Sequence, residues 1–197
     1  MIENIVADTS FYLCYYNDIN KRDFLDIFLN TYSFHLGPKI FKELPSELSE
    51  CSKFQSSTVF SEVSFFELIK PYFGRSKEHE DDGEYEAIGV ALHLNLHSNL
   101  KYLILDEKIA HNFVQSNFKS LTPKLKRNFS FIRDCYKIDS LISLSITIEI
   151  LETIKSCAEK AILEGNKHKR PCSTDIKVYN NILIPLIEEL KAEYECS

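Results

Sequence analysis

The sequence predicts an α/β fold in which a parallel sheet is covered by helices on both faces. Short apolar runs alternate with longer segments of helical pattern, as expected for a chain that returns repeatedly to one parallel sheet. Two of these runs, residues 4–7 and 102–105, are each followed directly by an aspartate. Because ligands bind outside the carboxyl ends of the strands in open α/β sheets, the same pattern predicts where a site would lie.

The elements expected in the first part of the chain follow from local patterns. Residues 4–7 are apolar and bounded by polar residues, which is typical of a buried parallel strand. Thr9 and Ser10 give a helix start signal, and Gly37-Pro38 opens another helix because proline suits the first turn. The expected elements are a strand at 4–7, helices from 9 and over 21–30, a strand at 33–36, a helix from 38, a strand or extended loop at 58–63 and a short helix at 65–72.

The second part of the chain repeats the alternation and then becomes helical. Residues 74–82 are polar and charged, which indicates a surface loop. The sequence Ser173-Thr174-Asp175 is a capping signal for the last helix. The expected elements are a helix at 83–98, a strand at 102–105, a helix at 107–118, a last strand at 128–132, a long helix at 139–164 and a final helix from 173 to 193.

Composition is that of an ordinary globular protein and excludes one class of nucleic-acid binder. With 197 residues, 44% of them hydrophobic, the chain can form one domain with a sizeable core. A formal net charge of −6 excludes binding through overall positive charge, so a nucleic-acid role would need a local basic patch or metal ions. We recognise no signal peptide and no membrane-spanning stretch, and we expect a cytoplasmic protein without a membrane partner.

The cysteines are expected to be reduced thiols, several of them filling the core. None forms a C-x-x-C pair or has zinc-ribbon spacing, and no neighbouring base indicates a catalytic thiol. A cytoplasmic location also favours free thiols. The cysteines are Cys14, Cys51, Cys135, Cys157, Cys172 and Cys196.

Acidic residues at element boundaries are the strongest indication of chemistry. An aspartate after one strand most often caps the next helix, and this interpretation is favoured for Asp8 taken alone. Several such acids together indicate a shared pocket that holds hard cations such as Mg²⁺ or Mn²⁺, which promote phosphodiester cleavage. The candidate catalytic acids are Asp8, Glu43, Glu84, Glu86 and Asp106.

Four segments, in order, resemble the PIN-domain nucleases, a family that includes the ribonuclease toxins of toxin–antitoxin pairs. Residues 5–10, Ile-Val-Ala-Asp-Thr-Ser, resemble the opening strand of that family, and residues 38–44 are similar to its second acidic helix. Residues 82–88 resemble the D-x-G-E-x-E-A-I segment of one subgroup, displaced by one residue at the first aspartate. Residues 102–110 resemble its strand-Asp-Asp-Lys-x-Ala segment.

The resemblance implies a three-layer α/β/α PIN-like fold with a central parallel sheet. It implies a nuclease domain at 1–135 and a helical C-terminal extension at 136–197, packed on the same domain. It also implies Mg²⁺ or Mn²⁺ as the cofactor and Thr9 or Ser10 as a polar helper. The implied metal ligands are Asp8, Glu43, Glu86 and Asp106.

The choice between Glu84 and Glu86 is open at the sequence level. Residues two apart on a helix do not face the same way, so only one of them is expected to be a direct ligand. Glu86 precedes Ala87 as the family's acid does, whereas Glu84 shares the more apolar helix face. The chain also departs from the family after Asp106, where no Gly- and Thr-containing segment and no T-x-D acid follow.

Two basic stretches are candidate RNA contacts, although charge runs usually lie in solvated loops. One contains Lys124, Lys126 and Arg127, and the other spans residues 167–170. The helical C-terminal part is more apolar than one covered face requires, which suggests an interface with a second copy or with an antitoxin.

These patterns lead to two functional hypotheses. The first is a Mg²⁺- or Mn²⁺-dependent endoribonuclease that hydrolyses RNA phosphodiester bonds, either as a toxin of a toxin–antitoxin pair or in RNA processing. The second is a catalytically inactive PIN-like module that binds a protein partner through its C-terminal helices.

Overall fold

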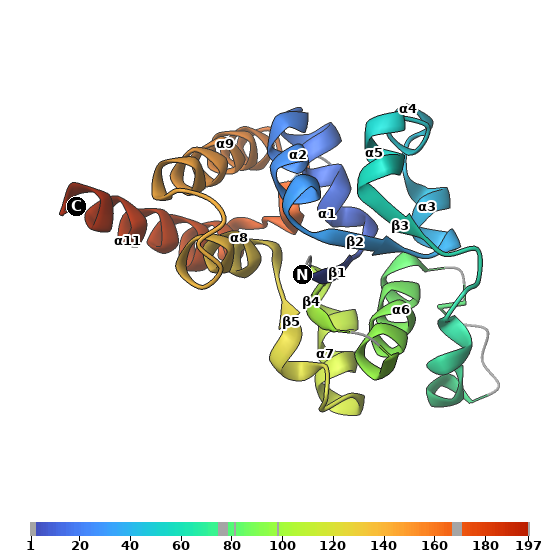
Figure 1. Cartoon of the computed structure of the whole chain (residues 1–197). Coiled ribbons are helices and arrows are strands. Elements are labelled where there is room, and N and C mark those ends of the chain that lie inside the picture. The colour runs from blue at the N-terminus through green and yellow to red at the C-terminus, as the bar shows by residue number, and fades with distance from the viewer. Residues whose placement is uncertain (1–2, 75–78, 81, 98, 167–170, 197) are drawn as a thin grey trace.

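A single five-stranded parallel sheet forms the centre of the molecule (Figure 1). The computed structural model describes the chain except residues 1–2, 75–78, 81, 98, 167–170 and 197. The strand order is β3-β2-β1-β4-β5, and every neighbouring pair is parallel. The predicted α/β class is therefore confirmed. The strands are β1 (Asn4–Ala7), β2 (Ser33–Leu36), β3 (Thr58–Phe60), β4 (Leu100–Ile104) and β5 (Leu125–Lys126).

Helices lie on both faces of the sheet, with α1 and α2 on one side and α6 and α7 on the other (Figure 1). The first part of the chain holds α1 (Thr9–Leu13), α2 (Arg22–Thr31), α3 (Pro38–Glu43), α4 (Ser46–Ser49), α5 (Ser52–Ser57) and α6 (Gly83–His97). The second part holds α7 (Lys108–Asn117), α8 (Asn128–Lys137), α9 (Leu144–Leu163), α10 (Ile176–Val178) and α11 (Ile184–Glu195). Shorter turns of 3₁₀ or π type are η1 (Cys14–Asp18), η2 (Phe66–Leu68), η3 (Lys70–Phe73), η4 (Thr122–Lys124), η6 (Pro171–Ser173) and η7 (Tyr179–Leu183).

The core joins the two halves of the chain through aromatic rings. Phe11 of α1 packs against Phe34 of β2 with ring centroids 5.3 Å apart, and against Phe131 of α8 at 5.7 Å. Phe28 of α2 also contacts Phe131, at 5.1 Å. These rings are almost completely buried, and buried aromatic side chains remove a large apolar area from water. Helix α8 is therefore held against the N-terminal helices.

The prediction of a strand at 128–132 is wrong, because these residues form the first half of α8. Phe129-Ser-Phe131 alternates like a strand, but the fully buried residues are spaced as on one face of a helix. They are Asn128, Phe131, Ile132 and Cys135. The fifth strand is instead β5, whose two residues are too few to show a period.

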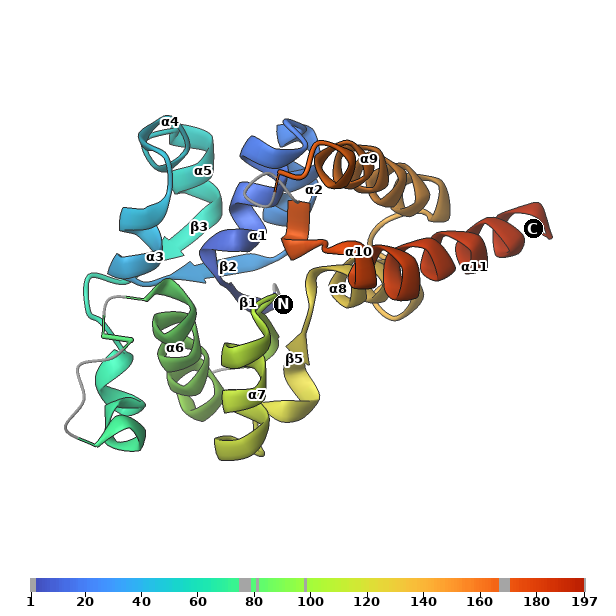
Figure 2. The ribbon, with the colours of Figure 1, turned by 180° about the vertical axis from the view of Figure 1, so that it is seen from behind.

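The C-terminal helices α9 and α11 pack against each other and contribute to the same core as the sheet (Figures 1 and 2). Helix α9 begins five residues later than the expected position 139, since the Ser143 hydroxyl caps it by accepting from the Ile146 amide at 3.2 Å. The expected boundary between residues 135 and 136 falls inside α8. Within the described part of the chain, no helix is both long and apolar enough to cross a membrane.

The expectation that all cysteines are reduced is wrong for one pair. Cys14 and Cys172 form a disulfide between residues that lie 158 positions apart. Sequence spacing did not indicate this bond, because the two cysteines meet only when η6 packs against α1 and η1. The free cysteines are Cys51, Cys135, Cys157 and Cys196.

Candidate functional site

Two aspartates meet where the chain leaves β1 and β4, the neighbouring strands in the middle of the sheet. From β1 the chain continues to β2 and β3 on one side, and from β4 it continues to β5 on the other. This reversal is the topological switch point at which open α/β sheets bind ligands. Asp8 follows β1 and Asp106 lies just beyond β4, and the Asp106 amide donates to Asp8 Oδ2 at 3.2 Å. The predicted proximity of these two acids is confirmed.

Asp8 is buried and fully hydrogen-bonded. Its Oδ1 accepts from the Ser10 hydroxyl at 2.6 Å and from the Phe11 amide at 3.1 Å, so Asp8 also caps α1. Burial raises the pKa of Asp8, and repulsion from Glu43 adds to it, although the hydrogen bonds act in the opposite direction. Asp8 is thus both a helix cap and a member of an acidic site.

Asp106 has one oxygen without a partner. Its Oδ1 accepts from the Asn128 amide at 2.9 Å, but its Oδ2 is buried and has no hydrogen-bond partner among the described residues. Burial and then repulsion from Asp8 raise the pKa of Asp106 to about 7, against the opposing effects of the Asn128 hydrogen bond and of Arg127. A buried carboxylate oxygen without a donor is costly unless a proton or a cation joins it.

Glu43 and Thr9 lie on the other side of Asp8. Glu43 Oε1 accepts from the Gly83 amide at 2.9 Å, and Glu43 Oε2 accepts from the Thr9 hydroxyl. A Cβ on residue 83 would overlap this carboxylate, which explains why glycine begins α6. Glu43 therefore binds the first amide of α6, where the helix dipole favours a negative charge.

Glu86 has a mirror-image role. Its Oε2 accepts from the amides of Lys39 and Ile40 in the first turn of α3, the second at 3.1 Å. Its Oε1 is also buried and finds no hydrogen-bond partner in the part of the chain that is described. Helices α3 and α6 thus cap each other through Glu43 and Glu86.

Glu84 is the acid of α6 whose pKa is raised by burial and by the other carboxylates. It is half-buried, and burial raises its pKa to about 7. Repulsion from Asp8, Glu43 and Glu107 adds to this rise, so Glu84 lies within electrostatic range of the aspartate pair. The two acids of α6 therefore have different surroundings: burial and the other carboxylates raise the pKa of Glu84, and Glu86 binds the start of α3.

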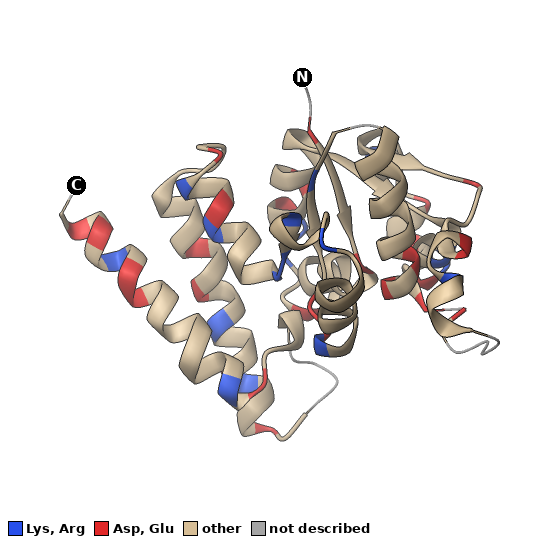
Figure 3. Cartoon of the chain, turned by 90° about the horizontal axis from the view of Figure 1, so that it is seen from below, with Lys and Arg blue, Asp and Glu red and all other residues tan. Residues whose placement is uncertain are grey.

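The basic residues expected near RNA are mostly engaged within the chain. Lys124 donates to the Asn95 side chain at 2.7 Å, and Lys126 pairs with the buried Asp134 at 2.7 Å. Arg127 is different, because it lines a cavity together with Asp106. The second basic stretch, residues 167–170, lies outside the described residues. Figure 3 shows Lys and Arg interspersed with Asp and Glu, without a single basic face in that view.

Asn128 is a residue of the site that the sequence did not indicate. It is fully buried at the start of α8, where it holds Asp106 through its amide and accepts from the Tyr15 hydroxyl at 2.9 Å. Its side-chain nitrogen also lies 3.1 Å from Cys172 Sγ. Asn128 lies in the segment expected to be a strand, and its position as the first residue of a helix, with its amide directed at Asp106, is not predicted.

The donor set fits a hard divalent cation. Asp8, Glu84 and Asp106 all have raised pKa values, and Asp106 Oδ2 has no donor among the described residues. A cation would neutralise this repulsion and supply the missing partner. In the described ranges, no group of three or more His, Cys, Asp or Glu side chains is already arranged as a metal site.

No family model, curated protein or solved structure matches this chain.

The raised pKa values predict that the metal-free protein is more stable in mild acid than above neutral pH. Asp106 and Glu84 each have a folded-state pKa of about 7, against ordinary values of 3.8 and 4.5. Between these limits the folded state binds more protons than the unfolded state, so the free energy of unfolding falls as pH rises to about 7 and then levels off. Thermal unfolding in chelator at about pH 5.5 and about pH 8 measures this difference. It should shrink in Asp106→Asn, and a higher Tm at the alkaline pH would contradict the prediction.

Proposed function

We propose that this protein is a Mg²⁺- or Mn²⁺-dependent endoribonuclease with a PIN-like fold. One observation carries the proposal: Asp106 Oδ2, which is buried and has no hydrogen-bond partner in the described ranges, lies beside a second buried aspartate at the switch point of the sheet. The PIN-like fold and the nuclease activity are both inferred from this placement and from the four sequence segments. A toxin role and an antitoxin partner belong to the same proposal.

The residues of the site have separate tasks in this mechanism. Asp8 and Asp106 would hold the cation, with Ser10, Phe11 and Asn128 fixing their carboxylates. When bound, the cation supplies charge neutralisation for the phosphodiester and makes water a better nucleophile.

In this mechanism Glu84 would accept a proton from the attacking water, and the leaving oxygen of the phosphodiester would take a proton from solvent. The Glu84 pKa of about 7 suits a general base that works near neutral pH, and the partial exposure of Glu84 gives it contact with solvent. Glu43 and Thr9 have no proton-transfer step here, since they join the start of α6 to α1 and so position Glu84.

Mn²⁺ calorimetry on a pair of variants tests which acid belongs to the site. Glu84→Gln is expected to weaken Mn²⁺ binding about tenfold or more, because it removes a negative charge within electrostatic range of Asp8. Glu86→Gln is the matched control on the same helix. Its amide oxygen can still accept from the start of α3, so Mn²⁺ affinity should stay near the wild-type value.

Two outcomes of this calorimetry count against the proposal. If the wild-type chain binds no Mn²⁺, the metal-dependent mechanism is wrong. If Glu86→Gln weakens Mn²⁺ binding and Glu84→Gln does not, Glu86 belongs to the metal site and Glu84 does not.

A non-catalytic interaction module is the second candidate. It is favoured by the use of Glu43 and Glu86 as helix caps, which gives both acids a structural reason to be present. This module would bind a protein through α9 and α11, and it would leave RNA intact at any Mn²⁺ concentration. Absence of Mn²⁺ binding in the calorimetry would support it.

A further inference from the structure

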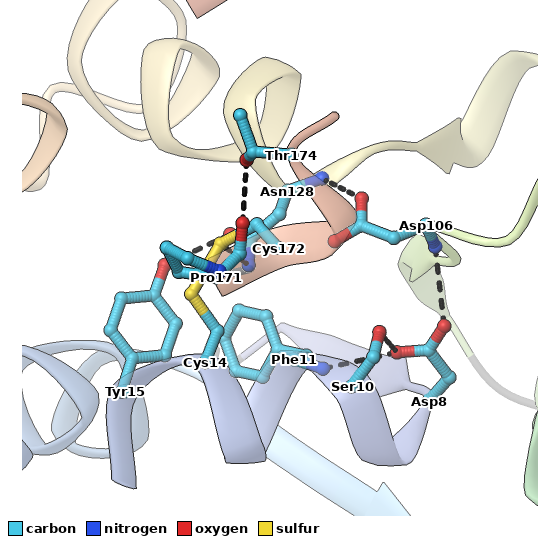
Figure 4. Close-up of a disulfide and its surroundings, with 10 residues drawn as sticks. All are labelled: Asp8, Ser10, Phe11, Cys14, Tyr15, Asp106, Asn128, Pro171, Cys172 and Thr174. Carbon is cyan, nitrogen blue, oxygen red and sulfur yellow. Dashed lines mark hydrogen bonds between the residues drawn. A yellow bond between two sulfur atoms is a disulfide. The ribbon is translucent and has the colours of Figure 1, made fainter. Parts of the chain in front are cut away.

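The disulfide joins the N-terminal half of the molecule to its C-terminal helices next to the acidic site (Figure 4). Cys14 follows α1, the helix that Asp8 caps, and Cys172 lies in η6, ahead of α10 and α11. Both cysteines are buried. The bond therefore ties the segment that carries Cys172 to the segment that carries Asp8.

Asn128 connects this disulfide to Asp106. Its side-chain nitrogen lies 3.1 Å from Cys172 Sγ, while its backbone nitrogen donates to Asp106 Oδ1 at 2.9 Å. Its side-chain oxygen accepts from Tyr15, the neighbour of Cys14 in the chain. Figure 4 shows these groups in one contiguous cluster, so a change at Cys172 reaches Asp106 through a single residue.

The turn that carries Cys172 also encloses the Asp106 carboxylate. Asp106, Cys172 and Ser173 line the same cavity of about 50 Å³. This space is small, and Asp106 Oδ2 is inaccessible to solvent within it. Access of an ion or of water to this oxygen depends on the position of the Cys172–Ser173 turn.

The turn that carries Cys172 has an unfavourable backbone conformation. Cys172 and Ser173 both have a φ of 52°, in the left-handed region that residues other than glycine rarely adopt. Such a conformation persists only where surrounding structure enforces it, and here the disulfide fixes one end of the turn. Without the bond, the turn keeps the two hydrogen bonds that Thr174 donates to the Pro171 carbonyl but loses its link to Cys14, so Cys172 can move toward ordinary φ values.

We infer that the Cys14–Cys172 pair is a redox site that controls access to the Asp106 carboxylate. A dithiol reductant opens it by attack of one thiolate on the sulfur of Cys172, a residue that lines the cavity, while Cys14 leaves as a thiolate and takes a proton. The second thiol of the reductant then closes on the first and releases Cys172 as a thiol. The protein gains two electrons and two protons, and the reductant becomes a cyclic disulfide.

Redox control of Asp106 can be tested without measuring catalysis. It rests on the proposed function only for the identity of what the accessible Asp106 would bind. It concerns the accessibility of a carboxylate, which is measured without RNA or metal. A failure to cleave RNA would leave the redox control standing, and a failure of redox control would leave the nuclease proposal standing.

Carboxylate labelling of the full chain tests the inference. The protein is treated with a water-soluble carbodiimide and glycinamide, before and after reduction by dithiothreitol, and the labelled peptides are quantified by mass spectrometry. Reduction is expected to speed labelling of Asp106 about tenfold, as for a local opening. Asp134 of α8, also buried, is the internal control, and its labelling rate should not change.

Cysteine variants complete the experiment. The double variant Cys14→Ser/Cys172→Ser is expected to label Asp106 rapidly with or without reductant. Cys51→Ser, which removes an exposed free thiol, should respond to reductant as the wild type does.

Three results would overturn the inference. One is alkylation of Cys14 and Cys172 by iodoacetamide in air-oxidised, unreduced protein, which would show that no bond forms. Another is an Asp106 labelling rate that reduction leaves unchanged. The third is an equal rise at Asp106 and Asp134, because it would indicate unfolding of the whole domain in place of a local opening.

Discussion

Replacing Asp106 by asparagine is expected to move activity and stability in opposite directions. Mn²⁺-dependent cleavage of single-stranded RNA should fall about a hundredfold or more, since the site loses a charge that neutralises the cation. Stability without metal should rise at neutral pH, because the substitution keeps the acceptor for Asn128 and removes a buried charge beside Asp8. A gain of about 1 kcal/mol would increase Tm by roughly 3 °C for a chain of this length.

Asp8→Asn is the matched control for this experiment. Both oxygens of Asp8 accept hydrogen bonds, so an amide nitrogen there must face a donor. This variant should lose cleavage as Asp106→Asn does, but without the gain in stability. The proposed mechanism fails if Asp106→Asn cleaves RNA at the wild-type rate in a preparation shown to be free of other nucleases.

Shortening Glu86 to alanine is expected to cost about 3 kcal/mol in the free energy of unfolding, because two amides of α3 lose their buried acceptor and a cavity remains. Gly37→Ala should cost a similar amount for the complementary reason. A Cβ on residue 37 would lie 2.5 Å from the carboxyl carbon of Glu86. Both effects therefore arise from one tightly packed contact.

The double variant Gly37→Ala/Glu86→Ala distinguishes this contact from two unrelated defects. Gly37 has a φ of −92°, which alanine adopts without strain, so the methyl group has room once the carboxylate is gone. The second substitution should then add only about 1 kcal/mol, the usual cost of alanine at a helix N-cap. Urea unfolding of the four proteins measures the coupling, and simple additivity of the two single effects would contradict the packing explanation.

The parts of the fold that the sequence predicted are those with a complete local pattern. Strand β1 and most of β4 are apolar runs, whereas β2 alternates buried and partly exposed residues. Asp8 and Asp106 are placed by the ends of β1 and β4. Helix α6 is mostly apolar on all sides and is buried without interruption from Tyr85 to Ala91, so its helical run is long enough to be recognised in the sequence. Strand β5 was missed because two residues carry no period, and α8 was mistaken for a strand because its first residues alternate.

The parts of the site that could not be predicted depend on contacts between distant segments. Glu84 and Glu86 differ in function only because α3 presents its first amides to one of them, 46 positions earlier in the chain. The bond between Cys14 and Cys172, and the position of Asn128 beside it, depend in the same way on how η6 meets α1. The spacing of side chains in the sequence indicates the period of each helix. It does not indicate which other helix begins or ends next to a given side chain.

The mutual capping of α3 and α6 affects how fast their amide hydrogens exchange with solvent. In an isolated helix of six residues, such as α3, the amide hydrogens would exchange quickly, because so short a helix frays easily. The amides of Lys39 and Ile40 in its first turn, however, donate to Glu86 of α6. The first amide of α6 likewise donates to Glu43 at the end of α3. These amides are therefore released only when the two helices separate. In deuterated water, we expect the shortest helices beside the acidic site to be among its slowly exchanging parts.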